Sequence, residues 1–168
     1  MLDALGLMNK HRSKGALVDT NLLVLLLVGS VNKQRILEFK RTQSFTIEDF
    51  DLLSRLVDWF GKLITTPHVL SQVSDLTDLA GEEFWTVRGK FASLVELMDE
   101  SYDECRTLVS HPLFSRLGLT DAAIATVCSR GILVLTTDVK LELALQQRGA
   151  DALNFNHLRS VGIGLTKM

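Results

Sequence analysis

The sequence has few of the residues that mark linkers and repeat proteins. Only two of its 168 residues are proline, and it contains no low-complexity tract and no internal repeat, so neither a second domain after a linker nor a solenoid is expected. Hydrophobic residues make up 46% and charged residues 23%, which is typical of a globular protein. We expect one folded domain over residues 15–168, preceded by a lead-in over residues 1–14.

Long hydrophobic runs are also lacking. The longest uninterrupted one, Leu22–Val28, has seven residues, whereas a membrane-spanning helix needs about 20. Basic residues precede this run as they do in a signal peptide, but Asp19 and Asn21 would then fall at the start of its apolar region, and no A-x-A-like cleavage site follows. The sequence therefore predicts no membrane segment and disfavours a signal peptide.

The sequence has only two cysteines and a small net charge. Cys105 and Cys128 lack C-x-x-C spacing, and the four histidines form no H-E-x-x-H pair, so neither a zinc site nor a redox motif is predicted. Such cysteine usage fits a reducing cytoplasm, and Cys128 is expected to be a packed core thiol. A net charge of -2 means that any nucleic-acid binding must depend on local basic patches.

Short apolar runs alternate with helical segments along the chain. Residues 15–18, 63–65 and 132–137 and the final ALNF segment are predicted strands. Strands that alternate with helices favour right-handed crossovers and a parallel sheet. The predicted class is α/β: a three-layer α/β/α sandwich with a mostly parallel central sheet.

The helical segments carry recognisable boundary signals. Thr46 and Asp49 form a T-x-x-D start resembling a capping box, and Pro67 suits the first turn of the next helix. A helix from Leu22 is expected to close at Gly29 and Ser30. Another is expected to begin with Thr120 as its N-cap. Residues 82–110 are predicted to be helical throughout, with a break near residues 98–101.

Three aspartates occupy positions where parallel sheets bind ligands. Asp19 and Asp138 follow buried strands, and Asp121 lies in the first turn of a helix; ligands bind at the carboxyl ends of such strands. Converging carboxylates repel one another unless a cation neutralises them, and oxygen ligands favour Mg²⁺ or Mn²⁺. Two such ions can hydrolyse a phosphodiester. Taken singly, Asp121 could be a favourable first-turn charge and Asp138 a helix N-cap.

Four motifs together resemble PIN domains, the metal-dependent ribonuclease fold of many bacterial toxins. They are VDTNLL, TPHVLSQVSDL, LGLTDAAIA and ILVLTTD, and the resemblance runs from about Gly15 to Arg159. It implies a parallel sheet covered on both sides by helices and an acidic pocket that binds Mg²⁺ or Mn²⁺. It also implies endonucleolytic cleavage of single-stranded RNA or of a structured RNA loop.

The resemblance also assigns roles to individual positions. Asp19, Asp121 and Asp138 match the metal-binding aspartates, Asn21 matches the residue that steadies the first of them, and Thr137 matches a hydroxyl that supports the pocket. As alternatives, Asn21 could form a turn and Thr137 could begin the next helix.

One motif position departs from the family. Where PIN domains usually have a glutamate this sequence has Gln72, a neutral ligand whose lack of charge should weaken metal binding. Asp75, one helical turn later, is either a substitute catalytic acid or a solvated helical charge.

Four basic residues precede the second motif and are candidates for binding RNA phosphates, or else line a solvated helix face: Lys33, Arg35, Lys40 and Arg41. Phe84, Trp85 and Phe91 belong either to a partner interface or to the core. The expected partners are RNA, an antitoxin protein and a second copy of the chain.

Three functions compete at this stage. The first is a Mg²⁺- or Mn²⁺-dependent endoribonuclease, with the toxin of a toxin–antitoxin pair as one form of it. The second is a catalytically weak or inactive binding module that lost turnover with Gln72. The third is a phosphohydrolase with Asp19 as nucleophile, but such enzymes have D-x-D after the first strand, and Asn21 replaces the second aspartate.

Overall fold

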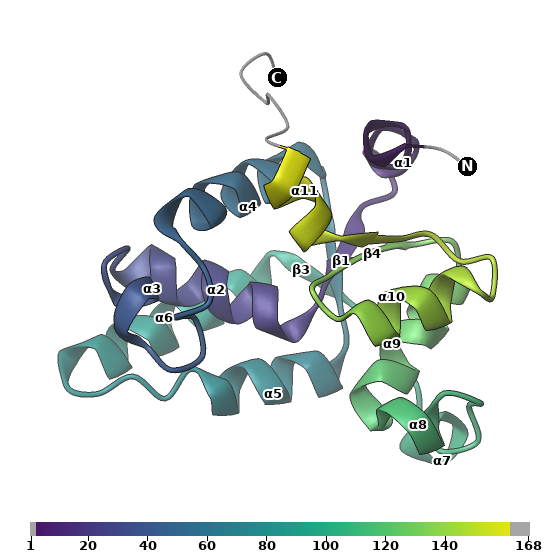
Figure 1. Cartoon of the computed structure of the whole chain (residues 1–168). Coiled ribbons are helices and arrows are strands. Elements are labelled where there is room, and N and C mark those ends of the chain that lie inside the picture. Colours follow the sequence, from purple (N-terminus) through teal and green to yellow (C-terminus); the bar gives the residue numbers. More distant parts are fainter. Residues whose placement is uncertain (1–2, 162–168) are drawn as a thin grey trace.

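A parallel sheet occupies the centre of the protein (Figure 1). Residues 3–161, which the computed structural model describes, contain five short strands. They are β1 (Ala16–Val18), β2 (Leu63–Thr65), β3 (Met98–Glu100), β4 (Leu133–Thr136) and β5 (Ala152–Asn154). Their spatial order is β3-β2-β1-β4-β5, and every neighbouring pair is parallel. The predicted α/β class is confirmed, and the sheet is wholly parallel.

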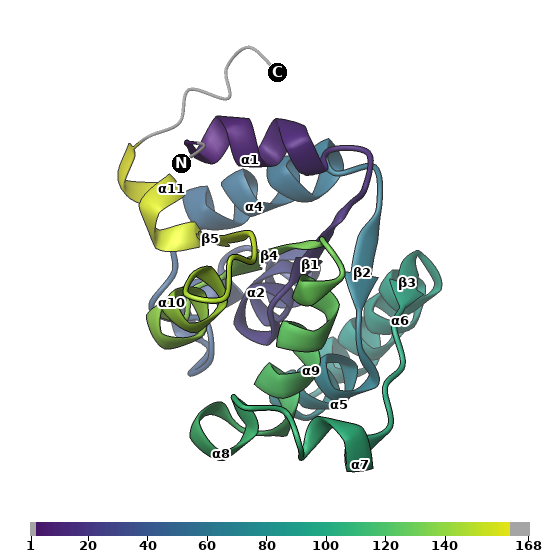
Figure 2. The ribbon, with the colours of Figure 1, turned by 90° about the vertical axis from the view of Figure 1, so that its right-hand side faces the viewer.

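Helices cover the sheet on both sides. The longer ones are α1 (Ala4–His11), α2 (Thr20–Val31), α4 (Ile47–Trp59), α5 (Pro67–Leu76), α6 (Glu82–Glu96), α9 (Leu119–Ser129), α10 (Val139–Gln146) and α11 (Phe155–Val161). Single-turn helices are α3 (Arg35–Glu38), α7 (Cys105–Leu108) and α8 (Phe114–Leu117). In both ribbon views α1, α4 and α11 lie above the central strands, and α5 and α9 lie below them (Figures 1 and 2). This is the expected three-layer arrangement.

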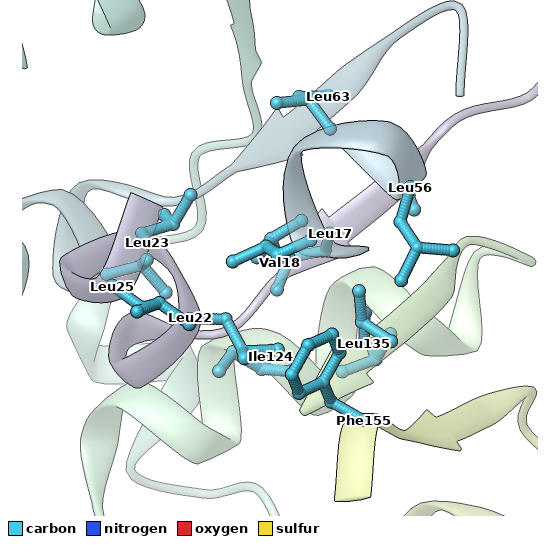
Figure 3. Packing of buried hydrophobic residues seen from close by; sticks show 14 of the residues in the cluster. Leu17, Val18, Leu22, Leu23, Leu25, Leu56, Leu63, Ile124, Leu135 and Phe155 are labelled. Carbon is cyan, nitrogen blue, oxygen red and sulfur yellow. The ribbon is translucent and has the colours of Figure 1, made fainter. Parts of the chain in front are cut away.

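The core forms where β1 and β4 meet the surrounding helices. Leu17 of β1, Leu22 of α2 and Leu135 of β4 are each at most 1% exposed, and Ile124 of α9 and Phe155 of α11 pack close to them (Figure 3). Because the central strands have helices on both faces, all three residues of β1 are buried, with no polar alternation. The backbone that leads into the sheet's carboxyl edge is therefore firmly held.

Two of the predicted helix starts are confirmed. The Thr46 hydroxyl accepts a hydrogen bond from the Asp49 N–H, and the Asp49 carboxylate accepts one from the Thr46 N–H, which completes a capping box for α4. Pro67 opens α5 behind Thr66, whose hydroxyl accepts from the Val69 N–H. Both features are encoded within four residues, which is why the sequence reveals them.

Three other boundary predictions were wrong. The helix from Thr20 runs to Val31, past Gly29. This glycine does not end the helix; it lies against the Phe50 ring, where a Cβ would not fit. The N-cap of α9 is Gly118, not Thr120. Gly118 has a φ of +92°, a conformation that suits glycine, so α8 can end and α9 begin at one residue.

The third correction concerns residues 82–110, which are not helical throughout, although the break falls where it was expected. The break contains the edge strand β3, in which only Met98 is buried, because Asp99 and Glu100 are exposed. An acidic, solvated edge strand has no apolar pattern by which it can be predicted.

The lead-in before residue 15 is a regular helix packed on the same core. The Asp3 carboxylate caps α1 by accepting from the Gly6 N–H, and Met8 is 1% exposed. Asp151, just before β5, accepts hydrogen bonds from Lys10 and pairs with the buried His11 at 2.7 Å. The first helix is therefore tied to the far end of the chain.

Candidate active site

The candidate site lies where the strand order reverses. From β1 the chain adds β2 and β3 on one side, then crosses over and adds β4 and β5 on the other. In open parallel sheets the crevice at such a switch point, outside the carboxyl ends of the strands, is the usual ligand site. Asp19 directly follows β1, and Asp138 lies two residues after the neighbouring β4.

One cavity of about 330 Å³ opens at this position. We call it the acidic cavity, and its lining residues are Asp19, Thr20, Asn21, Gln72, Asp75, Leu76, Asp121 and Asp138. It brings together all three aspartates predicted to hold metal with three of the other predicted site residues. Segments more than 100 residues apart in the sequence contribute to it.

Asp19 is the most buried of these carboxylates, at 7% exposure. It caps α2: one carboxylate oxygen accepts from the Thr20 N–H and the other from the Thr136 hydroxyl, both at 2.6 Å. Burial raises the pKa of Asp19 and the nearby Asp138 adds to this, whereas the two hydrogen bonds oppose it. The carboxylate is thus rigidly oriented, but its charge is costly without a cation.

Asp121 is the third residue of α9 and is half-buried. Burial, followed by the charges of Asp19 and Asp138, raises its pKa from 3.8 to about 7. The part of this shift that comes from Asp19 and Asp138 follows from their closeness to Asp121, since all three carboxylates line the same cavity.

Asp138 is exposed and serves as the N-cap of α10. Its Oδ1 accepts from the backbone N–H groups of Lys140 at 2.7 Å and Leu141 at 3.1 Å. The N-cap alternative for Asp138 is therefore true, and it does not compete with a role in the cavity, because Asp138 also lines it.

Helix α5 supplies the opposite wall. Gln72 and Asp75 both line the cavity from positions one turn apart. The Thr20 hydroxyl donates to Oε1 of Gln72 at 3.0 Å. One lone pair of the side-chain carbonyl is therefore occupied by the Thr20 hydroxyl, which leaves the second lone pair and the amide N–H₂ for a ligand.

The supporting hydroxyl comes from Thr136 rather than from Thr137. Thr136 is fully buried; its Oγ1 donates to Asp19 and accepts from the Asp138 N–H at 2.9 Å, so one hydroxyl joins two of the aspartates. Successive strand residues point to opposite faces, so a shift of one position changes which threonine faces the site. Asn21 lines the cavity, but the hydrogen bonds that hold Asp19 come from Thr20 and Thr136.

The predicted RNA-binding residues lie outside the acidic cavity, as its lining within residues 3–161 shows. Lys33 pairs with Asp51 at 2.7 Å, and Lys40 pairs with Asp78 at 3.3 Å. Arg35 pairs with both Glu38 and Glu83, whereas Arg41 is exposed. Acidic neighbours thus partly neutralise three of the four.

The hydrogen bonds that Thr20 and Thr136 make at the site were not predicted from the sequence. The signal was present for each: Thr20 follows the first aspartate directly, and Thr136 ends a buried strand. A buried hydroxyl needs a hydrogen-bond partner, and Thr136 has one in the carboxylate of Asp19, which follows the neighbouring strand β1.

The fold and site together define an α/β protein with an acidic cavity at the switch point of a parallel sheet. No protein-family model matches the sequence. No curated protein matches it at a significant level. Among residues 3–161, no helix combines the length and apolar character needed to cross a bilayer.

Proposed function

We propose that this protein is a PIN-type endoribonuclease that uses Mg²⁺ or Mn²⁺ and acts on RNA in the cytoplasm. The observation that carries the proposal is the convergence of Asp19, Asp121 and Asp138 on one cavity at the switch point of the sheet. The charges of Asp19 and Asp138 help to raise the pKa of Asp121, and the charge of Asp138 helps to raise that of Asp19; a bound cation would oppose both effects.

The donor set fits a hard divalent cation in its chemistry. Four carboxylates and two side-chain amides line the cavity, with no sulfur or imidazole among its lining residues, and oxygen ligands suit Mg²⁺ and Mn²⁺. In the described part of the chain, no three His, Cys, Asp or Glu side chains are grouped closely enough to hold a metal ion as they stand. Binding would therefore require the carboxylates that line the cavity to move closer together.

Each carboxylate has a distinct part in this proposal. A bound cation would supply neutralisation of the phosphate charge and activation of the attacking water. Asp19, fixed by Thr20 and Thr136, would give the cavity a rigid anionic wall. Asp121 would lose its proton as the cavity is loaded, and Asp138 would offer the oxygen that does not cap α10.

The test is cleavage of total cellular RNA with Mg²⁺ or Mn²⁺, mapped by sequencing of the new ends. We expect Asp121→Asn to lower cleavage at least about a hundredfold while the protein stays folded. Asp78→Asn is the matched control, because Asp78 is an exposed helix-end carboxylate that is not part of the cavity lining. Cleavage that persists at the original rate in Asp121→Asn with excess EDTA would exclude the metal mechanism.

A second function, an RNA- or protein-binding module without turnover, is favoured by one observation. Gln72 brings no charge, and its carbonyl accepts a hydrogen bond from Thr20, so the position that is usually a glutamate in PIN domains contributes no carboxylate to the cavity. Gln72→Glu should increase Mn²⁺ affinity, measured by calorimetry, and should create or increase cleavage. If both forms bind RNA but neither cleaves it with either metal, the binding module is the better account.

Partners remain part of the proposal. If the protein is the toxin of a toxin–antitoxin pair, a protein partner should contact Trp85, an aromatic side chain 74% exposed on α6. Phe84 and Phe91 are half-buried, and Phe84 packs edge-to-face on Trp85 with ring centroids 5.1 Å apart. A second copy of the chain is the other expected partner.

A further inference from the structure

A cysteine and a histidine that are 37 positions apart in the sequence meet at the carboxyl edge of the sheet. Nε2 of His68 lies 3.3 Å from Sγ of Cys105. Cys105 is exposed and begins α7, whereas His68 is half-buried in the first turn of α5. Nδ1 of His68 is buried and, among residues 3–161, has no hydrogen-bond partner.

The pair adjoins the acidic cavity without belonging to its lining. His68 and Gln72 are four residues apart, so they share one face of α5. On the other side, Leu108 of α7 packs against Ala122, the residue after Asp121. Figure 2 shows α7 beside the ends of α5 and α9. A group attached to Cys105 would therefore stand near the rim of the cavity.

The second cysteine provides a contrast within the same molecule. Cys128 is 2% exposed in α9, and its thiol donates to the carbonyl oxygen of Asp151 at 3.3 Å. Burial, followed by the charge of Asp151, raises the pKa of Cys128 to about 12. A thiol that is both inaccessible and held in its protonated form is inert toward disulfides, since the thiolate is the attacking species.

We propose that Cys105 is a reactive thiol that exchanges with low-molecular-weight disulfides, with His68 as its proton acceptor. Sγ gives its proton to Nε2 of His68 and bonds to one sulfur of the disulfide. The disulfide's own S–S bond breaks, and its second sulfur leaves as a thiolate that takes up the proton. Cys105 is thereby oxidised to a mixed disulfide, and the released half is reduced to a thiol.

Two features of the local structure support this chemistry. A nucleophilic thiol within hydrogen-bond reach of an imidazole is the arrangement in which a base assists sulfur attack. Cys105 is also exposed, so its sulfur is accessible to a small disulfide. The proposal does not depend on RNA cleavage by the acidic cavity.

The test is the rate of mixed-disulfide formation with oxidised glutathione, followed by intact mass and peptide mapping. We expect one adduct, on Cys105, and none in Cys105→Ser. His68→Gln keeps a polar side chain but cannot accept the proton, so it should slow the reaction about tenfold. His157→Gln, a change at an exposed histidine far from either thiol in the sequence, is the control and should leave the rate unchanged.

A second measurement requires no variant. Unfolding in urea separates Cys105 from His68, so Cys105 of the wild-type chain should react more slowly there than in the native protein. Unfolding also exposes Cys128, which should therefore react faster. The proposal is overturned if His68→Gln reacts within twofold of the wild type. It is equally overturned if native Cys105 is no faster than the unfolded thiol, or if native Cys128 acquires the adduct first.

Discussion

At the scale of single residues, Asp19 shows how a charge is kept inside an apolar stretch. The sequence around it is the most hydrophobic of the chain, and a buried carboxylate without partners would cost several kcal/mol. The first N–H of α2 and the Thr136 hydroxyl both donate to it, and the helix N-terminus adds a favourable field. The remaining penalty appears as its raised pKa.

Thr136 is the residue on which this arrangement depends. Thr136→Val would remove the donor to Asp19 and the acceptor for the Asp138 N–H while keeping the side-chain shape. We expect a loss of about 1–3 kcal/mol in the free energy of unfolding and weaker Mn²⁺ binding at pH 7. Thr137→Val, the adjacent control, should cost less than about 0.5 kcal/mol. Urea unfolding and calorimetry measure both; equal effects of the two variants would contradict the assignment.

At the scale of elements, two helical glycines should respond oppositely to the same change. A Cβ at Gly29 in α2 would overlap the Phe50 ring of α4, whereas a Cβ at Gly89 in α6 would meet nothing within 4 Å. Gly29 therefore allows two helices to approach closely, and Gly89 only adds flexibility to the unfolded chain.

We accordingly predict that Gly29→Ala lowers the free energy of unfolding by about 1–3 kcal/mol. Gly89→Ala should raise it by about 0.5–1 kcal/mol, because alanine is the better helix former. The two variants serve as controls for each other in urea or thermal unfolding. Stabilisation by Gly29→Ala would mean that α2 and α4 are less closely packed than the structure indicates.

Helix α5 shows how far element-level prediction extends. Thr66, Pro67 and the apolar spacing define its start and its buried face, and all are local signals. The same spacing places Gln72 and Asp75 together, so the presence of both in the cavity could be anticipated. The contacts of α5 with Thr20 and Cys105 could not, because they depend on where α2 and α7 are placed in the fold.

At the scale of the whole molecule, opposing pKa shifts define a pH profile of stability. Folding raises the pKa of Asp121 from 3.8 to about 7 and also raises that of Asp19. The folded protein then holds more protons than the unfolded chain, so this contribution to stability is lost as pH rises from about 4 through 7. Lys10 and His11 lower the pKa of Asp151, whose contribution is lost as pH falls below its usual value of 3.8.

Without divalent metal, stability should therefore peak at weakly acidic pH. Asp121 is half-buried, so solvent screening reduces its effect, and we expect a fall of about 1–2 kcal/mol between pH 5 and pH 8. Asp121→Asn should flatten this fall, and Asp78→Asn should not. Urea unfolding in EDTA at several pH values measures the slopes, and identical slopes for wild type and Asp121→Asn would refute the coupling.

The features that could be predicted from the sequence are those that short-range interactions specify. Helix starts such as Thr46 and Pro67, the buried strands, and the aspartates at their ends follow from residues within one or two turns of each other. Those signals were enough for the α/β class and for naming Asp19, Asp121 and Asp138 as a group. The edge strand β3 was not predicted, because its exposed acidic residues have no apolar periodicity.

Contacts between residues that are far apart in the sequence depend on the arrangement of the whole fold. The order β3-β2-β1-β4-β5 places β4 beside β1, and this brings Thr136 to Asp19 across 117 positions of sequence. The same packing brings Thr20 into hydrogen-bond contact with Gln72 and His68 into contact with Cys105. Such contacts depend on how whole elements bury their apolar faces against each other, which no local pattern encodes.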